Sequence, residues 1–351
     1  MRTPPDTLPL ELTPGAGPLS EGPEGRPTSP VLELVICTYN NAAMLAGALA
    51  AIAAQRVSEA QAWGVLVVNN NCTDHTVAVV TQAQQTGNIP QLRMVTETRQ
   101  GLTPARLCGV QHTTAPWIAF VDDDCFLQPD WVAHALEFAA QHPTCGAFGG
   151  RVTLAWETPP PAYVLNFTYA FAEQELGPEA KPVSWLVGAG MVINRAALVA
   201  VGWTERQLLA DRVGKQLVSG GDMEIALRLA AHYELWYTPH CQLLHQIPRQ
   251  RTHDDYLLKI NYGLGGSQLF VSSLQWGRSY PAWVWASLRE AWRQTAYYGK
   301  RWLKAAIAQE STREATISLC FWWGYWVGIW RLFTLNPQKR QQLLGSAKPP
   351  C

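Results

Sequence analysis

Short runs of consecutive apolar residues recur through the first 120 positions and alternate with segments of helical pattern. The pattern predicts strands at 32–37, 64–68, 92–96 and 117–121, with helices at 42–55, 75–85 and 104–112 between them. Strands that lack polar alternation and are separated by helices are typical of a parallel sheet covered on both faces. The predicted fold class is therefore α/β, with a mostly parallel sheet flanked by helices.

Polar clusters follow three of these strands at their carboxyl ends. They are Thr38–Asn41, Asn69–Asp74 and Asp122–Asp124. In open α/β sheets, ligands bind outside the carboxyl ends of the strands. The sequence therefore predicts a ligand site on one rim of the sheet, to which all three clusters contribute.

The two ends of the chain differ from its middle. Residues 1–30 contain eight prolines and no stretch that could bury a core, which predicts a disordered leader without a secretory pattern. Residues 31–250 hold the predicted catalytic domain. Residues 251–351 form a predicted helical unit that carries 9 of the 16 tryptophans.

The charge distribution and the cysteine content indicate a partner for the tail and a cellular compartment. The net charge is zero, yet residues 251–351 carry 13 Lys and Arg against 5 Asp and Glu. Such asymmetry points to an acidic surface as a partner of the tail, either a membrane or a polyanion. The 8 cysteines are scattered without a CxxC pair, which favours a reducing, cytoplasmic compartment over a disulfide framework.

The basic tail has features of a membrane-surface segment. Residues 315–330 are uncharged, but a spanning helix needs about 20 apolar residues. Trp322, Trp326 and Trp330 repeat at every fourth position, and further upstream tryptophans alternate with basic residues. This composition fits a helix lying in the inner face of a cell membrane, and it equally fits a helical pair packed on protein.

Three consecutive aspartates, Asp122–Asp124, follow a buried strand. Such a cluster is costly unless a cation or strong hydrogen bonds compensate it. Carboxylates prefer hard cations such as Mg²⁺ or Mn²⁺, which also bind diphosphate oxygens. His245 could add a further metal ligand, and Arg99 and Arg106 could reach phosphate or pair with acids. The alternative is a solvated acidic turn.

A second constellation lies at Ser219–Glu224. Its glycines and Asp222 predict a helix start, with Asp222 at or near the N-cap. A carboxylate there stays ionised and is available as a general base, although an ordinary N-cap explains the pattern as well. The glycine-rich segment Trp185–Met191 lacks phosphate-loop spacing, so it predicts either close backbone approach or tight packing.

Five motifs in this order and spacing resemble the family 2 glycosyltransferases over about residues 31–250. The matching stretches are Val35–Asn40, Val67–Asp74, Arg99–Leu102, Phe120–Asp124 and Gly220–Glu224. The resemblance implies a GT-A fold, which is Rossmann-like, and an inverting single displacement. The sequence is most similar to bacterial exopolysaccharide enzymes, including those of hormogonium polysaccharide synthesis.

The resemblance also implies roles for individual residues. Asp122 and Asp124 match the metal-binding DxD motif, with Asp124 the direct ligand. Asp222 matches the catalytic base, and Glu224 is expected to orient it or the acceptor. Contacts to the donor are expected from Thr38, Tyr39, Asn40, Asn69, Asn71, Asp74, Arg99, Gly101, Arg106, Asp122 and Asp123.

Two departures from the family pattern refine the predicted reaction. The resemblance favours a UDP-sugar, but Asn69 stands where the family commonly has Asp near the nucleotide base, so GDP- and dTDP-sugars stay open. The Gln-x-x-Arg-Trp motif of processive enzymes is absent from Gln246–Gln250. We therefore expect one sugar to be transferred per encounter, to a hydroxyl of a glycan or lipid-linked acceptor.

Other classes explain less of the sequence. A nucleotidyltransferase needs a basic, glycine-rich loop after the first strand, where this chain has Thr38–Ala43. A non-catalytic nucleotide-sugar or polysaccharide-binding protein would not need both the aspartate cluster and Asp222. A membrane scaffold accounts for the tail and leaves the rim motifs unexplained. No nucleic-acid partner is predicted.

Overall fold

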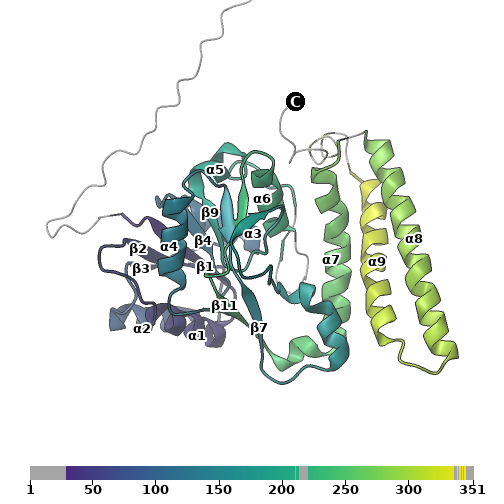
Figure 1. Ribbon diagram of the computed structural model, residues 1–351, viewed down its shortest axis with the longest axis horizontal. Coiled ribbons are helices and arrows are strands. Elements are labelled where there is room, and N and C mark those ends of the chain that lie inside the picture. The colour runs from purple at the N-terminus through teal and green to yellow at the C-terminus, as the bar shows by residue number, and fades with distance from the viewer. Residues whose placement is uncertain are drawn as a thin grey trace, which may run out of the picture.

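The computed structural model describes residues 29–209, 211–212, 220–277 and 279–335, together with residues 338, 340, 342 and 344. The predicted leader at 1–30 therefore lies almost wholly outside the described residues, as does Ser219. The described chain forms an α/β unit with a group of long helices at one side (Figure 1).

An eight-stranded sheet forms the centre of the α/β unit. Its strand order is β3-β2-β1-β4-β9-β6-β10-β8, and the pairs among β3, β2, β1 and β4 are parallel. β9 runs antiparallel between β4 and β6, and β8 runs antiparallel to β10. The strands are β1 (Leu32–Thr38), β2 (Trp63–Asn69), β3 (Leu92–Thr96), β4 (Trp117–Phe120), β6 (Ala147–Gly149), β8 (Lys181–Val183), β9 (Met191–Asn194) and β10 (Leu235–Tyr237).

Helices cover both faces of this sheet, because each central strand buries side chains on both sides. One core joins the sheet to α1 (Ala42–Ala53), α2 (Thr76–Thr86) and α4 (Trp131–Gln141). A second core joins it to α3 (Leu102–Gln111), α5 (Arg195–Ala200) and α6 (Gly221–Ala230). The predicted α/β fold with a mostly parallel sheet flanked by helices is confirmed.

A small second sheet lies beside the carboxyl end of β4. It consists of β5 (Cys125–Leu127), β11 (Leu243–Ile247) and β7 (Val152–Trp156), in the order β5-β11-β7. β5 and β11 are antiparallel, and His245 is the partner of Cys125. Short 3₁₀ helices, η1 (Ala162–Phe171) and η2 (Arg249–Thr252), adjoin this sheet in the chain. The pairing brings His245 to the aspartates that precede β5.

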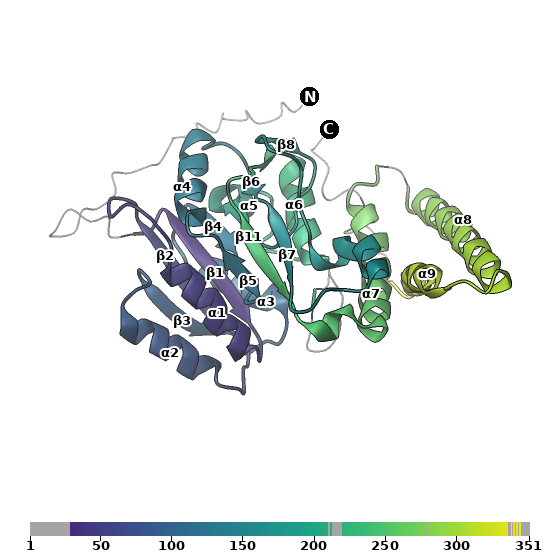
Figure 2. The same cartoon turned by 60° about the horizontal axis from the view of Figure 1, so that its bottom comes forward.

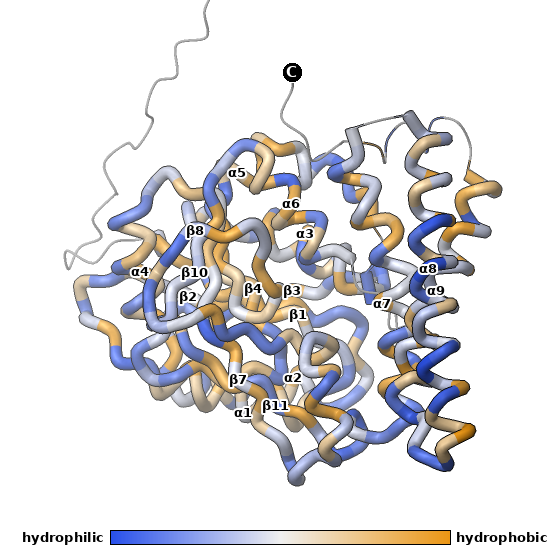
Figure 3. Tube along the Cα trace, turned by 45° about the vertical axis from the view of Figure 1, so that its right-hand side comes forward, coloured by the Kyte–Doolittle hydropathy of each residue, from blue (hydrophilic) through white to orange (hydrophobic). Residues whose placement is uncertain are grey.

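Three long helices complete the described chain: α7 (Asp254–Leu274), α8 (Tyr280–Ile307) and α9 (Arg313–Leu332). α7 adjoins the α/β unit, α9 packs on α7, and α8 lies outermost (Figures 1 and 2). A Cβ added at Gly265 or Gly324 would overlap a backbone carbonyl of the opposite helix, so glycine at these two positions permits the close approach of α7 and α9. Hydrophobic and hydrophilic residues alternate along α8 and α9 (Figure 3). None of the described helices is long and apolar enough to cross a membrane.

Candidate active site

A cavity of about 390 Å³ opens at the carboxyl ends of β1 and β4. The rim predicted from the sequence is therefore hollowed, and residues from α3, α6, β11 and α7 close it from the sides. Ten of the predicted site residues line this cavity: Thr38, Tyr39, Asn40, Gly101, Arg106, Asp122, Asp123, Asp124, Asp222 and His245.

Asp123 ties the ends of two strands together. Its Oδ2 accepts a hydrogen bond from the Thr38 hydroxyl at 2.6 Å, and its Oδ1 accepts one from the Asn41 amide at 2.7 Å. Asn41 occupies the N-cap position of α1, but its side chain makes no capping bond. Burial, reinforced by the neighbouring Asp124, raises the pKa of Asp123 to about 7, although these two bonds oppose the rise.

Asp124 and His245 form the part of the cavity best suited to a cation. Asp124 Oδ1 lies 3.4 Å from His245 Nε2, and its Oδ2 lies 2.9 Å from Arg251 Nη1. Burial opposes ionisation of Asp124, yet His245 and Arg251 hold its pKa well below the ordinary value. The Nδ1 of His245 lies 2.7 Å from the carbonyl oxygen of Phe171, to which it can donate in the tautomer that leaves Nε2 free as a ligand.

Cys125 also belongs to this group, since its sulfur lies with the Asp124 and His245 ligand atoms in one buried cluster within 4.8 Å. Oxygen and imidazole nitrogen suit Mn²⁺ and Mg²⁺ better than a thiolate does. Burial raises the pKa of Cys125 well above its ordinary value, so its thiol stays protonated. The donor set therefore fits a hard or borderline cation held by Asp124 and His245.

Arg106 links three carboxylates at the other side of the cavity. Its guanidinium is 2% exposed and pairs with Asp222 and, at 3.1 Å, with Asp211. Asp122 Oδ1 lies 3.9 Å from the same group. Burial opposes the charge of Arg106, but the three aspartates raise its pKa above the ordinary value. Arg106 thus acts as the fixed counter-ion of this acidic cluster.

Glycines make room for two of these carboxylates. A Cβ added at Gly188 would overlap the carboxylate of Asp222, and one at Gly221 would overlap that of Asp211. At Gly188 the glycine-rich segment 185–191 therefore packs tightly against the Asp222 side chain. Asp222 itself lies in the first turn of α6, with Gly220 at the N-cap position.

Four predicted donor-binding residues do not line the cavity. Asn69 and Asn71 bond to backbone groups of the loops around them, at 2.8 and 2.6 Å. Asp74 accepts two bonds from Thr76 and one from the first residue of α1. Arg99 pairs with Glu97 at 2.7 Å. Their contacts stabilise the loops that frame the cavity.

Glu224 also lies outside the cavity. Its fully buried carboxylate accepts hydrogen bonds from the backbone N–H groups of Leu208 and Leu209 at 2.7–2.9 Å and pairs with Arg228 at 2.6 Å. Burial raises the pKa of Glu224, against the influence of Arg228. These contacts make Glu224 a residue that fixes the segment before Asp211.

Further cavity residues were missing from the sequence prediction. Asp211 stands in no recognisable motif, and Arg251, which pairs with Asp124, lies beyond the last matching motif. Asn70 donates to the carbonyls of Glu97 and Arg99 and accepts from the N–H of Gly101, which shapes the loop that precedes α3. Asn70 belongs to the polar cluster Asn69–Asp74 after β2, but the sequence prediction named other residues of this cluster as donor contacts.

The fold is of the GT-A type that glycosyltransferases share. Residues 33–201 match the family model Glycosyl transferase family 2. A mannosyltransferase from Pyrobaculum calidifontis, solved in complex with GDP-Man and Mn²⁺, has a similar structure with a TM-score of 0.54. The two chains are 20% identical, and the match covers 90% of this chain and 91% of the other.

A curated relative supports the same class. The glucosyl-dolichyl phosphate glucuronosyltransferase of Haloferax volcanii is 22% identical over 183 residues, which are 50% of this chain. The match spans 57% of the length of that relative.

Proposed function

We propose that this protein transfers a single sugar, with inversion, from a nucleotide-sugar donor to a hydroxyl of a glycan or lipid-linked acceptor. The observation that carries the proposal is the cavity that unites a cation-binding pair, Asp124 and His245, with Asp222 on one rim. A binding protein would not need a charged base beside a metal site.

Asp124 and His245 would hold a divalent cation, either Mn²⁺ or Mg²⁺, and Asp122 is exposed enough to contribute a further oxygen. When bound, the cation would neutralise charge on the diphosphate leaving group. Arg251 pairs with the same carboxylate and would add positive charge beside the diphosphate.

Asp222 would act as the general base. In a single displacement, the acceptor oxygen forms a bond to the anomeric carbon while the bond from that carbon to the diphosphate oxygen breaks. The acceptor proton passes to the Asp222 carboxylate. Arg106 pairs with this carboxylate and holds it in place before the acceptor arrives.

The nucleotide would lie against the wall formed by Thr38, Tyr39 and Asn40. We favour a UDP-sugar from the sequence resemblance. The similar mannosyltransferase was solved with GDP-Man, which makes a GDP-sugar the second candidate. Asn69, the position that departs from the family, bonds to backbone in the loop after β2, so it leaves both bases open.

The test is donor hydrolysis by the purified protein across UDP-, GDP- and dTDP-sugars with Mn²⁺, Mg²⁺ or EDTA. We expect metal-dependent release of one nucleotide, which Asp124→Ala abolishes. Asp222→Ala should retain metal-dependent nucleotide binding and lose transfer. Turnover that survives Asp124→Ala, or the absence of metal-dependent nucleotide binding in every condition, would refute the proposal.

We further propose peripheral attachment to the inner face of the cell membrane, in the service of exopolysaccharide biosynthesis. Trp285 and Trp292 of α8 are 69% and 70% exposed, and basic side chains neighbour them along the helix. This pattern suits an anionic bilayer interface. Binding to anionic liposomes at low salt, weakened in Trp285→Ala/Trp292→Ala, would support it; a protein that ignores such liposomes would contradict it.

A further inference from the structure

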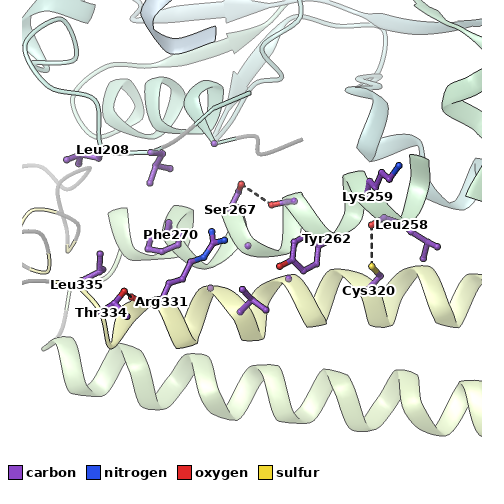
Figure 4. A pocket seen from close by; sticks show the side chains of 17 residues that line it. Leu208, Leu258, Lys259, Tyr262, Ser267, Phe270, Cys320, Arg331, Thr334 and Leu335 are labelled. Atoms are coloured by element: carbon purple, nitrogen blue, oxygen red, sulfur yellow. Dashed lines mark hydrogen bonds between the residues drawn. The ribbon is translucent and has the colours of Figure 1, made fainter. Parts of the chain in front are cut away.

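A second and larger cavity lies beside the active site. Its volume is about 870 Å³, and α7 and α9 form its floor (Figure 4). Leu208, Leu209 and Gly220 line it from the catalytic domain. Cavities of this size hold long or bulky organic ligands. We call this cavity the α7–α9 groove.

The α7–α9 groove and the active-site cavity are lined by neighbouring residues of the same segments. Ile260 and Leu264 of α7 line the active-site cavity, while Gly263 and Gly266 of the same helix line the groove. On the other side, Gly220 borders the groove two residues before Asp222. The start of α6, which carries Asp222, and helix α7 therefore lie between the two cavities.

The groove is apolar and is kept open by small residues. Apart from its glycines it is lined largely by hydrophobic side chains, such as Leu258, Phe270 and Val327. A Cβ added at Gly266 would meet a single backbone oxygen, at 3.5 Å, so space is free above this position. An open apolar cavity of this kind stabilises an apolar chain by removing it from water.

The charges at the groove have one sign. Lys259 and Arg331 line it, both are exposed, and neither pairs with an acid among the described residues. No Asp or Glu appears among its described lining residues. An occupant with a phosphate group on an apolar chain would match both properties of the groove.

We infer that the α7–α9 groove binds the apolar tail of a lipid-phosphate-linked acceptor and presents its sugar hydroxyl to Asp222. The inference rests on the proposed transfer reaction and names the acceptor class. The occupant is a long-chain lipid that bears phosphate. Arg331 contacts the phosphate, because it lies at the end of the groove where Leu208 and Leu209 pack with Phe270, whereas Lys259 precedes Phe270 by about three helical turns.

The experiment measures binding of farnesyl phosphate to the full chain by calorimetry, without donor. Dimethylallyl phosphate has the same head on a short tail, and we expect it to bind roughly 100-fold more weakly because it buries far less apolar surface. Gly266→Leu fills the groove and should weaken farnesyl phosphate binding by about tenfold or more. Gly299→Leu places the same side chain in open space on α8 and is the matched control.

The head group is tested separately. Arg331→Gln should weaken binding of farnesyl phosphate by about tenfold and leave farnesol binding unchanged, since an alcohol lacks the charge that this side chain meets. Equal affinity for farnesyl and dimethylallyl phosphate would overturn the inference. Full binding of farnesyl phosphate by Gly266→Leu would also overturn the inference. So would the absence of farnesyl phosphate binding by the parent protein.

Failure of this inference is distinguishable from failure of the proposed function. Donor hydrolysis needs no lipid, so Gly266→Leu should release nucleotide at the parental rate. A protein that hydrolyses donor but does not bind farnesyl phosphate keeps its proposed reaction and loses the lipid acceptor.

Discussion

Gly188→Ala is a minimal change that should disable the active site while leaving the fold in place. The added methyl group would overlap the Asp222 carboxylate, so either this carboxylate or the backbone of segment 185–191 must move. Ordinary contact requires about 3.5 Å between the atoms, which demands a shift of roughly 1 Å. The carboxylate is the more mobile partner, although Arg106 holds it from the opposite side.

The size of the effect follows from that shift. A general base displaced by about 1 Å typically loses on the order of 100-fold in rate, or about 2.7 kcal/mol of transition-state stabilisation. We expect a fall of this size in kcat for sugar transfer, with metal-dependent nucleotide affinity unchanged, because Asp124 and His245 lie elsewhere in the cavity. Stability should change little, since the strain falls on a side chain.

The assay is steady-state transfer with nucleotide release as the readout, run beside calorimetric nucleotide binding and thermal unfolding. Gly299→Ala on α8 is the control, because a Cβ there meets no other atom within 4 Å. A Gly188→Ala protein with parental kcat would show that Asp222 does not need its present position. Loss of nucleotide binding or of folding would show that the substitution acts through the backbone.

Three further substitutions test other contacts. Arg106→Met leaves buried carboxylates without their counter-ion and should cost about 3–5 kcal/mol of unfolding free energy in urea titrations; an unchanged midpoint would contradict its role. His245→Ala should weaken Mn²⁺-dependent nucleotide binding by about tenfold or more in calorimetry, and equal affinity would remove His245 from the metal site. Gly324→Ala forces α9 away from α7 and should cost about 1–3 kcal/mol, so a melting temperature at or above the parental value would refute the close approach.

The fold was predictable where the sequence repeats a strong local pattern. The four apolar runs before residue 122 became β1 to β4, and the polar clusters behind β1 and β4 line one cavity. Strands of three residues, such as β5 (Cys125–Leu127), are too short to carry a period. The antiparallel insertion of β9 depends on contacts between segments far apart in the chain.

The site was predictable to the extent that each residue stood in a motif. Asp124 and Asp222 did, and both line the cavity. Asp211 did not, because its position beside Arg106 follows from a contact across 105 residues. The opposite difficulty arose for Glu224, which stands in a motif although its carboxylate is fully occupied by backbone N–H groups and Arg228. A motif locates a chain segment, and the packing around it decides which side chains face a ligand.

Helix α7 has a consequence for how the tail must be studied. Ile260 and Leu264 form part of the active-site wall, and the Asn261 side chain accepts a hydrogen bond from the Tyr169 hydroxyl at 2.5 Å. Removing residues 251–351 would therefore open the active site as well as the groove, so a truncated protein that lost activity would say nothing about membranes. Substitutions on the outer helix, such as Trp292→Ala, leave α7 in place. They separate attachment to a membrane from the geometry of transfer.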